Sequence, residues 1–160
     1  MTAVLTIERA SFSSPWTRKM FLAELHDNAF SRFFVAELAG EGIVGYAGGW
    51  IILDELQVLS LAVRPECRRR GIARGLLARL FRAGMGPMVK AGLEVRRSNG
   101  AAIAMYEGFG FRLAGVRPRY YREPTEDALI MQWIAEEGRT GGWRGFPESP
   151  ERTKEVPNGQ

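Results

Sequence analysis

The chain has 160 residues, of which 46% are hydrophobic and 25% charged, as expected for one soluble globular domain with a single core. A single cysteine and a single histidine exclude an internal disulfide and a metal cluster, so we expect no metal. No apolar run reaches membrane-spanning length and no secretory signal is visible, so we expect a cytoplasmic protein without membrane contact, whose net charge of +4 suits an acidic ligand.

The first predicted elements are a strand and a helix. Residues 3–10 (AVLTIERA) contain β-branched side chains typical of a short edge strand. Ser14 is a good N-cap and Pro15 suits the first helical position, so a helix is predicted from there to about Asn28.

A hairpin and a central strand follow. Residues 32–38 and 43–53, joined by the turn at 39–42, predict two antiparallel strands. Residues 55–63 predict a further, central strand. Three glycines in the second strand predict bends or a close backbone approach: Gly45, Gly48 and Gly49.

The second half of the chain predicts alternating helices and strands. Apolar residues at spacing four, such as Ile72 with Leu76, make the helix after Gly71 the strongest helix signal. A short strand at 93–97 and a helix at 98–110 follow, and strands at 111–121 and 128–134 complete the fold. Together these elements predict an α/β domain over residues 1–135, with a mixed sheet and helices on its faces, and a flexible tail over 136–160.

The turn RRRGIA (68–73) has the properties of an anion site. A helix start offers unpaired N–H groups and partial positive charge, and Gly71 lets a ligand approach the backbone closely. The side chains of Arg68, Arg69 and Arg70 add charged donors. From these residues alone, a phosphate site and a solvated basic helix start with a packing glycine are equally good interpretations. The glycine patterns of dinucleotide-binding and P-loop proteins are absent, which argues against nicotinamide cofactors and nucleoside triphosphates.

The turn at 68–73, directly after a predicted strand, resembles the Arg/Gln-x-x-Gly-x-Gly/Ala signature of the GNAT N-acetyltransferases. Residues 14–21, 93–111 and 120–131 also look like regions of the RimI type, the ribosomal-protein-alanine N-acetyltransferases, in the same order. The resemblance covers roughly residues 1–135. It implies a GNAT fold, in which a mixed, mostly antiparallel sheet has helices on both faces and a splayed pair of parallel strands.

The resemblance implies acetyl-CoA as the co-substrate. Its pyrophosphate is expected on the backbone of the arginine turn, and its pantetheine arm along the strand before that turn. Asn99 is expected to contact the pantetheine or the phosphates, although an N-cap for the following helix is an equally good interpretation. The implied cofactor-binding residues are Leu61, Ala62, Val63, Arg68, Arg69, Arg70, Gly71, Ile72, Ala73, Arg74 and Asn99.

The same resemblance places a general base at Glu94 and a general acid at Tyr106. An α-amine has a pKa of about 7.7–8.0, so a group must take its proton before it attacks a thioester. The alternatives are a salt bridge of Glu94 with Arg96 or Arg97, and a core packing role for Tyr106. Gly92, next to Leu93, departs from the family pattern and leaves the register of the strand that carries Glu94 open.

The expected acceptor is a protein N-terminus, by resemblance that of a ribosomal protein. Its groove is expected between Trp16 and the last hairpin, around Tyr120 and Tyr121, although Trp16 is equally suited to packing in the core. A small amine or a lysine side chain is the alternative acceptor, and a non-catalytic acyl-CoA-binding or ribosome-binding module is the alternative function. We expect no direct contact with nucleic acid and a monomer or weak dimer.

Overall fold

The structure is a computed structural model that describes residues 1–135 and 152–156. Its elements in chain order are α1 (Thr2–Ser11), α2 (Arg18–Asp27), β1 (Ser31–Leu38), β2 (Gly42–Ile52), β3 (Glu55–Val63), the 3₁₀-helix η1 (Pro65–Cys67), α3 (Ile72–Phe81), β4 (Lys90–Arg96), α4 (Gly100–Phe109), β5 (Arg112–Arg122), β6 (Thr125–Ile134) and β7 (Arg152–Val156). No helix in the described residues is long and apolar enough to cross a membrane.

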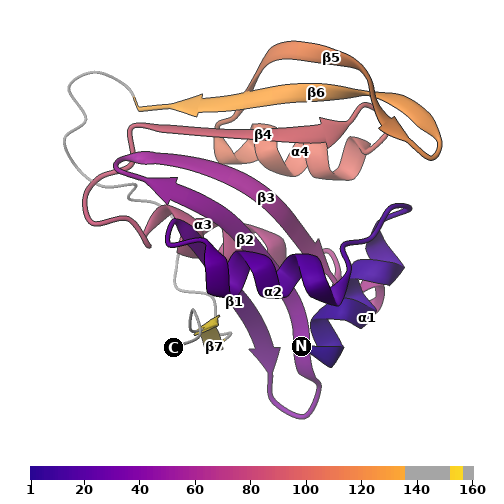
Figure 1. Cartoon of the computed structure of the whole chain (residues 1–160), viewed down its shortest axis with the longest axis vertical. Helices are drawn as coiled ribbons and strands as arrows, with labels where there is room; N and C mark the ends of the chain where they lie inside the picture. Colours follow the sequence, from indigo (N-terminus) through magenta and orange to yellow (C-terminus); the bar gives the residue numbers. More distant parts are fainter. Residues whose placement is uncertain (136–151, 157–160) are drawn as a thin grey trace.

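The strands form one sheet in the order β5-β6-β4-β3-β2-β1-β7 (Figure 1). Every neighbouring pair is antiparallel except β3 and β4, which are parallel. Two apolar clusters flank the sheet: α3 and α4 bury side chains such as Leu77 and Phe109 on one face, and α1 and α2 bury Ile7 and Phe21 on the other. The predicted mixed sheet with helices on both faces is confirmed.

The parallel pair separates soon after it forms. β3 and β4 pair only from Glu55 with Lys90 to Gln57 with Gly92, yet β3 runs on to Val63 and β4 to Arg96. Figure 1 shows the two strands diverging toward their carboxyl ends. A bulge at Leu59, opposite the Gly48–Gly49 step, lies at the start of the separated part of β3. The expected splayed pair is therefore present.

The close backbone approach predicted for the β2 glycines is confirmed at Gly48 and Gly49. A Cβ atom on Gly48 would lie 2.0 Å from the ring of Phe33, and one on Gly49 would lie 2.7 Å from the carbonyl oxygen of Gln57. A side chain at either position would push strands or rings apart.

The N-terminal prediction is wrong, because residues 2–11 form helix α1 and not an edge strand. Val4, Ile7 and Glu8 are buried, at the spacing of three and four that places residues on one face of a helix. Burial of that face against the sheet outweighs the local β propensity. Helix α2 also begins later than predicted, with Thr17 and not Ser14 as its N-cap: the hydroxyl of Thr17 accepts the N–H of Met20 at 3.3 Å.

Part of the segment expected to be a flexible tail has regular structure. Arg152–Val156 form β7, which pairs antiparallel with β1 from Phe33 with Val156 to Glu37 with Arg152. This strand extends the sheet beyond β1, and no alternating pattern in the sequence had predicted it. Residues 136–151 and 157–160 lie outside the described residues.

Candidate active site

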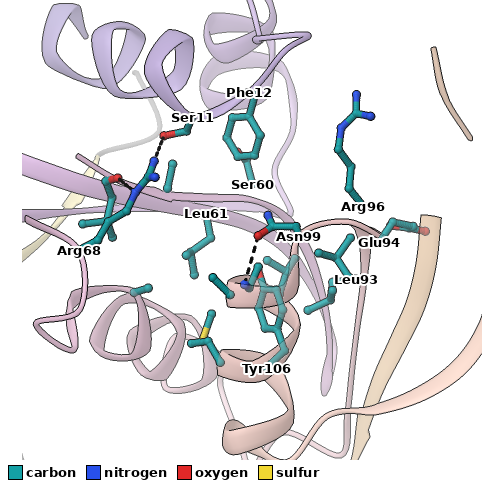
Figure 2. Close-up of a pocket in the computed structure, with 18 of the residues that line it drawn as sticks. Ser11, Phe12, Ser60, Leu61, Arg68, Leu93, Glu94, Arg96, Asn99 and Tyr106 are labelled. Carbon is teal, nitrogen blue, oxygen red and sulfur yellow. Dashed lines mark hydrogen bonds between the residues drawn. The ribbon is translucent and has the colours of Figure 1, made fainter. Parts of the chain in front are cut away.

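A cavity of about 980 Å³ opens where β3 and β4 separate (Figure 2). Its walls come from the end of α1 and the loop after it, the second half of β3, the start of α3, β4, the start of α4 and the β5–β6 hairpin. Segments distant in the sequence therefore meet around one space, at the point where β3 and β4 separate.

The arginine turn forms one end of the cavity. Gly71 has a φ of 84°, in the left-handed region that favours glycine. The first helical hydrogen bond of α3 runs from the N–H of Gly75 to the carbonyl of Gly71 at 3.0 Å. Within the described residues, the N–H groups of Ile72 and Ala73 therefore meet no carbonyl, and both residues line the cavity. Such a helix start fits an anionic ligand.

The three consecutive arginines take different directions. Arg68 donates from Nε to the carbonyl oxygen of Val63 at 3.0 Å and from Nη2 to the hydroxyl of Ser11 at 3.2 Å. Arg69 lines the cavity, whereas Arg70 turns to Glu41, with Nη1 3.3 Å from its carboxylate. The Arg70 side chain is therefore directed toward the Glu41 carboxylate and does not line the cavity, whereas Arg68 and Arg69 do.

The strand before the turn presents a free edge. Leu61, Ala62 and Val63 pair with β2 on one side only, because β4 has already separated on the other. All three residues line the cavity. Ala62 and Val63 are buried, so their side chains pack in the core while their main chain remains on the cavity wall.

Glu94 occupies the wall opposite β3. Burial alternates along β4, so Leu93 and Val95 point into the core and Glu94 points to the other face, with its side chain 23% exposed. Gln57 donates from Nε2 to Glu94 Oε2 at 3.1 Å, and Nη2 of Arg117 lies 3.5 Å from Oε1. The alternative of a salt bridge with Arg96 or Arg97 is wrong.

Glu94 also borders a second cavity of about 420 Å³. The second cavity is lined by polar residues that include Gln57, Arg117 and Gln132. In Figure 2 the carboxylate extends away from Tyr106. Glu94 therefore lines two cavities that are large enough to hold water.

Tyr106 projects from α4 into the first cavity. It is 7% exposed, and its ring packs 5.6 Å from that of Phe111. No other group in the described part of the chain forms a hydrogen bond with its hydroxyl. Burial, and to a lesser extent Tyr121, raises the pKa of Tyr106 well above its ordinary value. The hydroxyl is therefore protonated at neutral pH and can donate a hydrogen bond.

Asn99 acts as the N-cap of α4. Its side-chain oxygen accepts the N–H of Ala102 at 3.2 Å, so the capping interpretation is confirmed (Figure 2). Asn99 also lines the cavity, and the cap leaves its amide nitrogen available as a donor.

The predicted acceptor residues lie at the other end of the cavity. Trp16 lines the cavity and also packs against Phe21 and Phe33, with ring centroids 5.2 and 6.5 Å apart, so its packing role is confirmed and its acceptor role stays a prediction. Tyr121 lines the cavity, whereas Tyr120 is 49% exposed and lies outside its wall. Burial raises the pKa of Tyr121 to about 12.

Arg96 joins the two sides of this end of the cavity. Its Nη2 donates to Ser13 at 2.9 Å, its Nη1 lies 3.2 Å from the carboxylate of Glu126, and its guanidinium lies 4.2 Å from the centre of the Tyr121 ring. The loop after α1 is thereby tied to the β5–β6 hairpin. The only sequence signal for this role was the position of Arg96 two residues after Glu94, which places both on one face of β4.

Glu8 is a site residue that sequence reasoning missed. It is 1% exposed, and its carboxylate accepts the N–H of Trp16 at 2.7 Å and the hydroxyl of Tyr46. That hydroxyl also lies 2.7 Å from the hydroxyl of Ser60 on β3. Burial raises the pKa of Glu8. The signal was its spacing of four from Val4, which a helical interpretation of residues 3–10 would have used.

Comparisons with known proteins agree with this geometry. The model of the Acetyltransferase (GNAT) family matches residues 1–111. The ribosomal protein bS18-alanine N-acetyltransferase of Salmonella typhimurium is 37% identical over 137 residues, 82% of this chain and 88% of that protein. The N-alpha-acetyltransferase RimI of Mycobacterium tuberculosis is 38% identical over 122 residues, 74% of this chain and 75% of that protein. The crystal structure of the ribosomal-protein-S18-alanine N-acetyltransferase from Escherichia coli superposes with a TM-score of 0.71 at 32% identity, covering 87% of this chain and 90% of that one.

Proposed function

Since the chain belongs to the acetyltransferase (GNAT) family, we propose that it transfers an acetyl group from acetyl-CoA to the N-terminal α-amine of a protein. By the names of its relatives, the proposed acceptor is a ribosomal protein of the bS18 type with an N-terminal alanine. One observation carries the proposal: a single cavity connects an anion-binding helix start, a free strand edge, an acid and a base. A site that held only an anion would not need the last three.

The residues around the arginine turn fit acetyl-CoA. The amides of Gly71, Ile72 and Ala73 at the start of α3 would hold the pyrophosphate, together with the backbone of Arg69 and Arg74. The free edge of β3 at Leu61 to Val63 and the amide nitrogen of Asn99 would hold the amide-rich pantetheine arm. Arg68 lines the cavity and is proposed to contact the co-substrate, whereas the side chain of Arg70 pairs with Glu41.

Glu94 and Tyr106 supply the proton transfers. Acetyl-CoA provides the acetyl group as a thioester, which an unprotonated amine attacks. Glu94 takes the proton of the α-amine, and the two cavities that it lines leave room for a bridging water. Tyr106, which burial keeps protonated, donates its hydroxyl hydrogen toward the departing sulfur.

The acceptor end of the cavity favours a peptide over a small amine. Trp16 on the loop before α2 and Tyr121 on β5 both line it, and Arg96 contacts the Tyr121 ring and Ser13 of the loop that carries Trp16. Aromatic walls of this kind suit an extended chain whose N-terminus points toward the thioester. A lysine side chain or a small amine needs less of this surface.

The test is acetylation of short peptides followed by mass spectrometry. We expect peptides with a free N-terminal alanine to gain one acetyl group, and the same peptides with a blocked N-terminus and an internal lysine to gain none. Acetylation of blocked peptides or of small amines alone would overturn the α-amine proposal. Binding of acetyl-CoA without transfer to any amine would support the non-catalytic module instead.

A further inference from the structure

Gln57 and Gly92 form a structural unit beneath Glu94. They are the last pair of the parallel register between β3 and β4, so they face each other where the two strands begin to separate. Both lie on the sheet face that carries Glu94, because burial alternates and the neighbouring Leu56 and Leu93 point into the core. The Gln57 side chain must cross Gly92 to reach the carboxylate two residues further along β4.

The contacts show how the crossing is achieved. Nε2 of Gln57 donates to Glu94 Oε2 at 3.1 Å. A Cβ atom on Gly92 would lie 3.2 Å from Oε1 of the same Gln57 amide, which is tighter than an ordinary contact. Gly92 has no positive φ that would require glycine. The space over Gly92 is therefore occupied by the amide that holds Glu94.

The other contact of the Glu94 carboxylate, with Arg117, holds its orientation less firmly. Arg117 lies 3.5 Å from Oε1 through a side chain that is 55% exposed. An exposed ion pair at that distance fixes a carboxylate weakly. Gln57 is partly buried and donates at a normal hydrogen-bond distance, so it determines the direction of the second oxygen.

We propose that Gln57 is a positioning residue that orients the Glu94 carboxylate for proton transfer, and that position 92 is glycine so that Gln57 can reach it. The inference rests on the proposed role of Glu94 as the base. The proposal explains why glycine, which departs from the family pattern, stands at position 92. Gln57, Gly92 and Glu94 all line the second cavity.

The test compares substitutions that remove the donor or block its path. Gln57→Met keeps the length of the side chain and removes the donor, and Gly92→Val fills the space that the amide crosses. Each should lower kcat by roughly ten-fold, the effect of one hydrogen bond to a charged group, and leave the KM for acetyl-CoA within about two-fold. Because both act through one contact, the double variant should lose no more than the larger single loss.

Matched controls make the same exchanges nearby. Gln132→Met alters the glutamine that pairs with Gly92 from the other side, on β6. Gly115→Val alters a sheet glycine on β5 whose nearest contact to an added Cβ is 3.6 Å. Neither residue contacts Glu94, so kcat should stay within about two-fold of the wild type, and denaturant unfolding should show all variants folded.

The Glu94→Gln background separates the inference from the function on which it rests. In that background, Gln57→Met should change the residual kcat less than two-fold. A ten-fold loss that persists there, or an unchanged kcat for Gln57→Met in the wild-type background, would overturn the inference and leave the proposed function standing. An unchanged kcat for Glu94→Gln alone would overturn the proposed base and the inference together.

Discussion

Replacement of Tyr106 by phenylalanine removes one atom from the candidate site and leaves the core intact. The ring would keep its contact with Phe111, which lies 5.6 Å away. The hydroxyl has no hydrogen-bond partner in the described residues, so its removal breaks no bond within that part of the protein. We therefore expect the free energy of unfolding to change by less than about 1 kcal/mol, with a small gain from the loss of a buried polar group.

The same substitution should strongly affect catalysis. If Tyr106 protonates the departing thiolate, Tyr106→Phe loses the contribution of a general acid, which is roughly 10²-fold to 10⁴-fold in kcat. In the wild type, the raised pKa of Tyr106 keeps the hydroxyl protonated through the alkaline range. The alkaline side of the kcat profile should therefore show no loss from its ionisation below about pH 10, the ordinary value for tyrosine.

The assay is release of free thiol from acetyl-CoA in the presence of an N-terminal alanine peptide, together with urea unfolding monitored by fluorescence. Tyr120→Phe is the matched control, because Tyr120 is half-exposed and lies outside the cavity wall. A Tyr106→Phe variant with a kcat within three-fold of the wild type would refute the acid role. A variant that loses several kcal/mol of stability would refute the packing argument.

Three further substitutions, one of them with a matched control, test other parts of the site. Gly71→Ala places a side chain at a φ of 84° and should lower the free energy of unfolding by roughly 1–2 kcal/mol. It should also weaken acetyl-CoA binding, as measured by calorimetry. An unchanged affinity would contradict pyrophosphate binding at the start of α3. Arg96→Ala should raise the KM for the peptide and lower the free energy of unfolding by about 2–4 kcal/mol. Its control, Arg97→Ala, breaks an exposed ion pair and should lower the free energy of unfolding by less than about 1 kcal/mol. Equal effects would refute the proposal that Arg96 holds the loop after α1 against the β5–β6 hairpin. The raised pKa of Glu8 means that the folded state binds its proton more tightly than the unfolded state does, so ionisation lowers stability as the pH rises. Urea unfolding should therefore show Glu8→Gln gaining stability relative to the wild type between pH 4 and pH 7, and a constant difference would exclude this linkage.

Local patterns predicted most of the elements. The β1–β2 hairpin, the central strand and helix α3 came from short-range periodicity and turn residues, which do not depend on distant contacts. Helix α4 was also correct, because Asn99 caps it and Gly110 ends it in the left-handed conformation. The comparisons confirm the family resemblance, and that resemblance is the source of the proposed roles of Glu94 and Tyr106, which stay predictions.

Errors arose where tertiary packing outweighs local preference. Residues 3–10 contain β-branched side chains, but Val4 and Ile7 are buried in a helix that covers the second face of the sheet. Strand β7 exists because the edge of β1 is available to pair with it, and that availability is a property of the folded sheet. The pairing of β7 cannot be read from its own segment, whereas the helical spacing of Val4 and Ile7 was present in residues 3–10 and competed there with the β-branched side chains.

The sequence by itself determined that an arginine turn and a glycine stand at the start of a helix, since these residues are contiguous, and from this it predicted an anion site there. Only the tertiary structure decided which groups surround Glu94. Gln57 reaches it through the parallel register of β3 with β4, and Arg117 reaches it from β5, beyond β6. Strand register places residues dozens of positions apart within hydrogen-bond distance, and it is fixed by burial across the whole sheet and not by the residues on either side of a site.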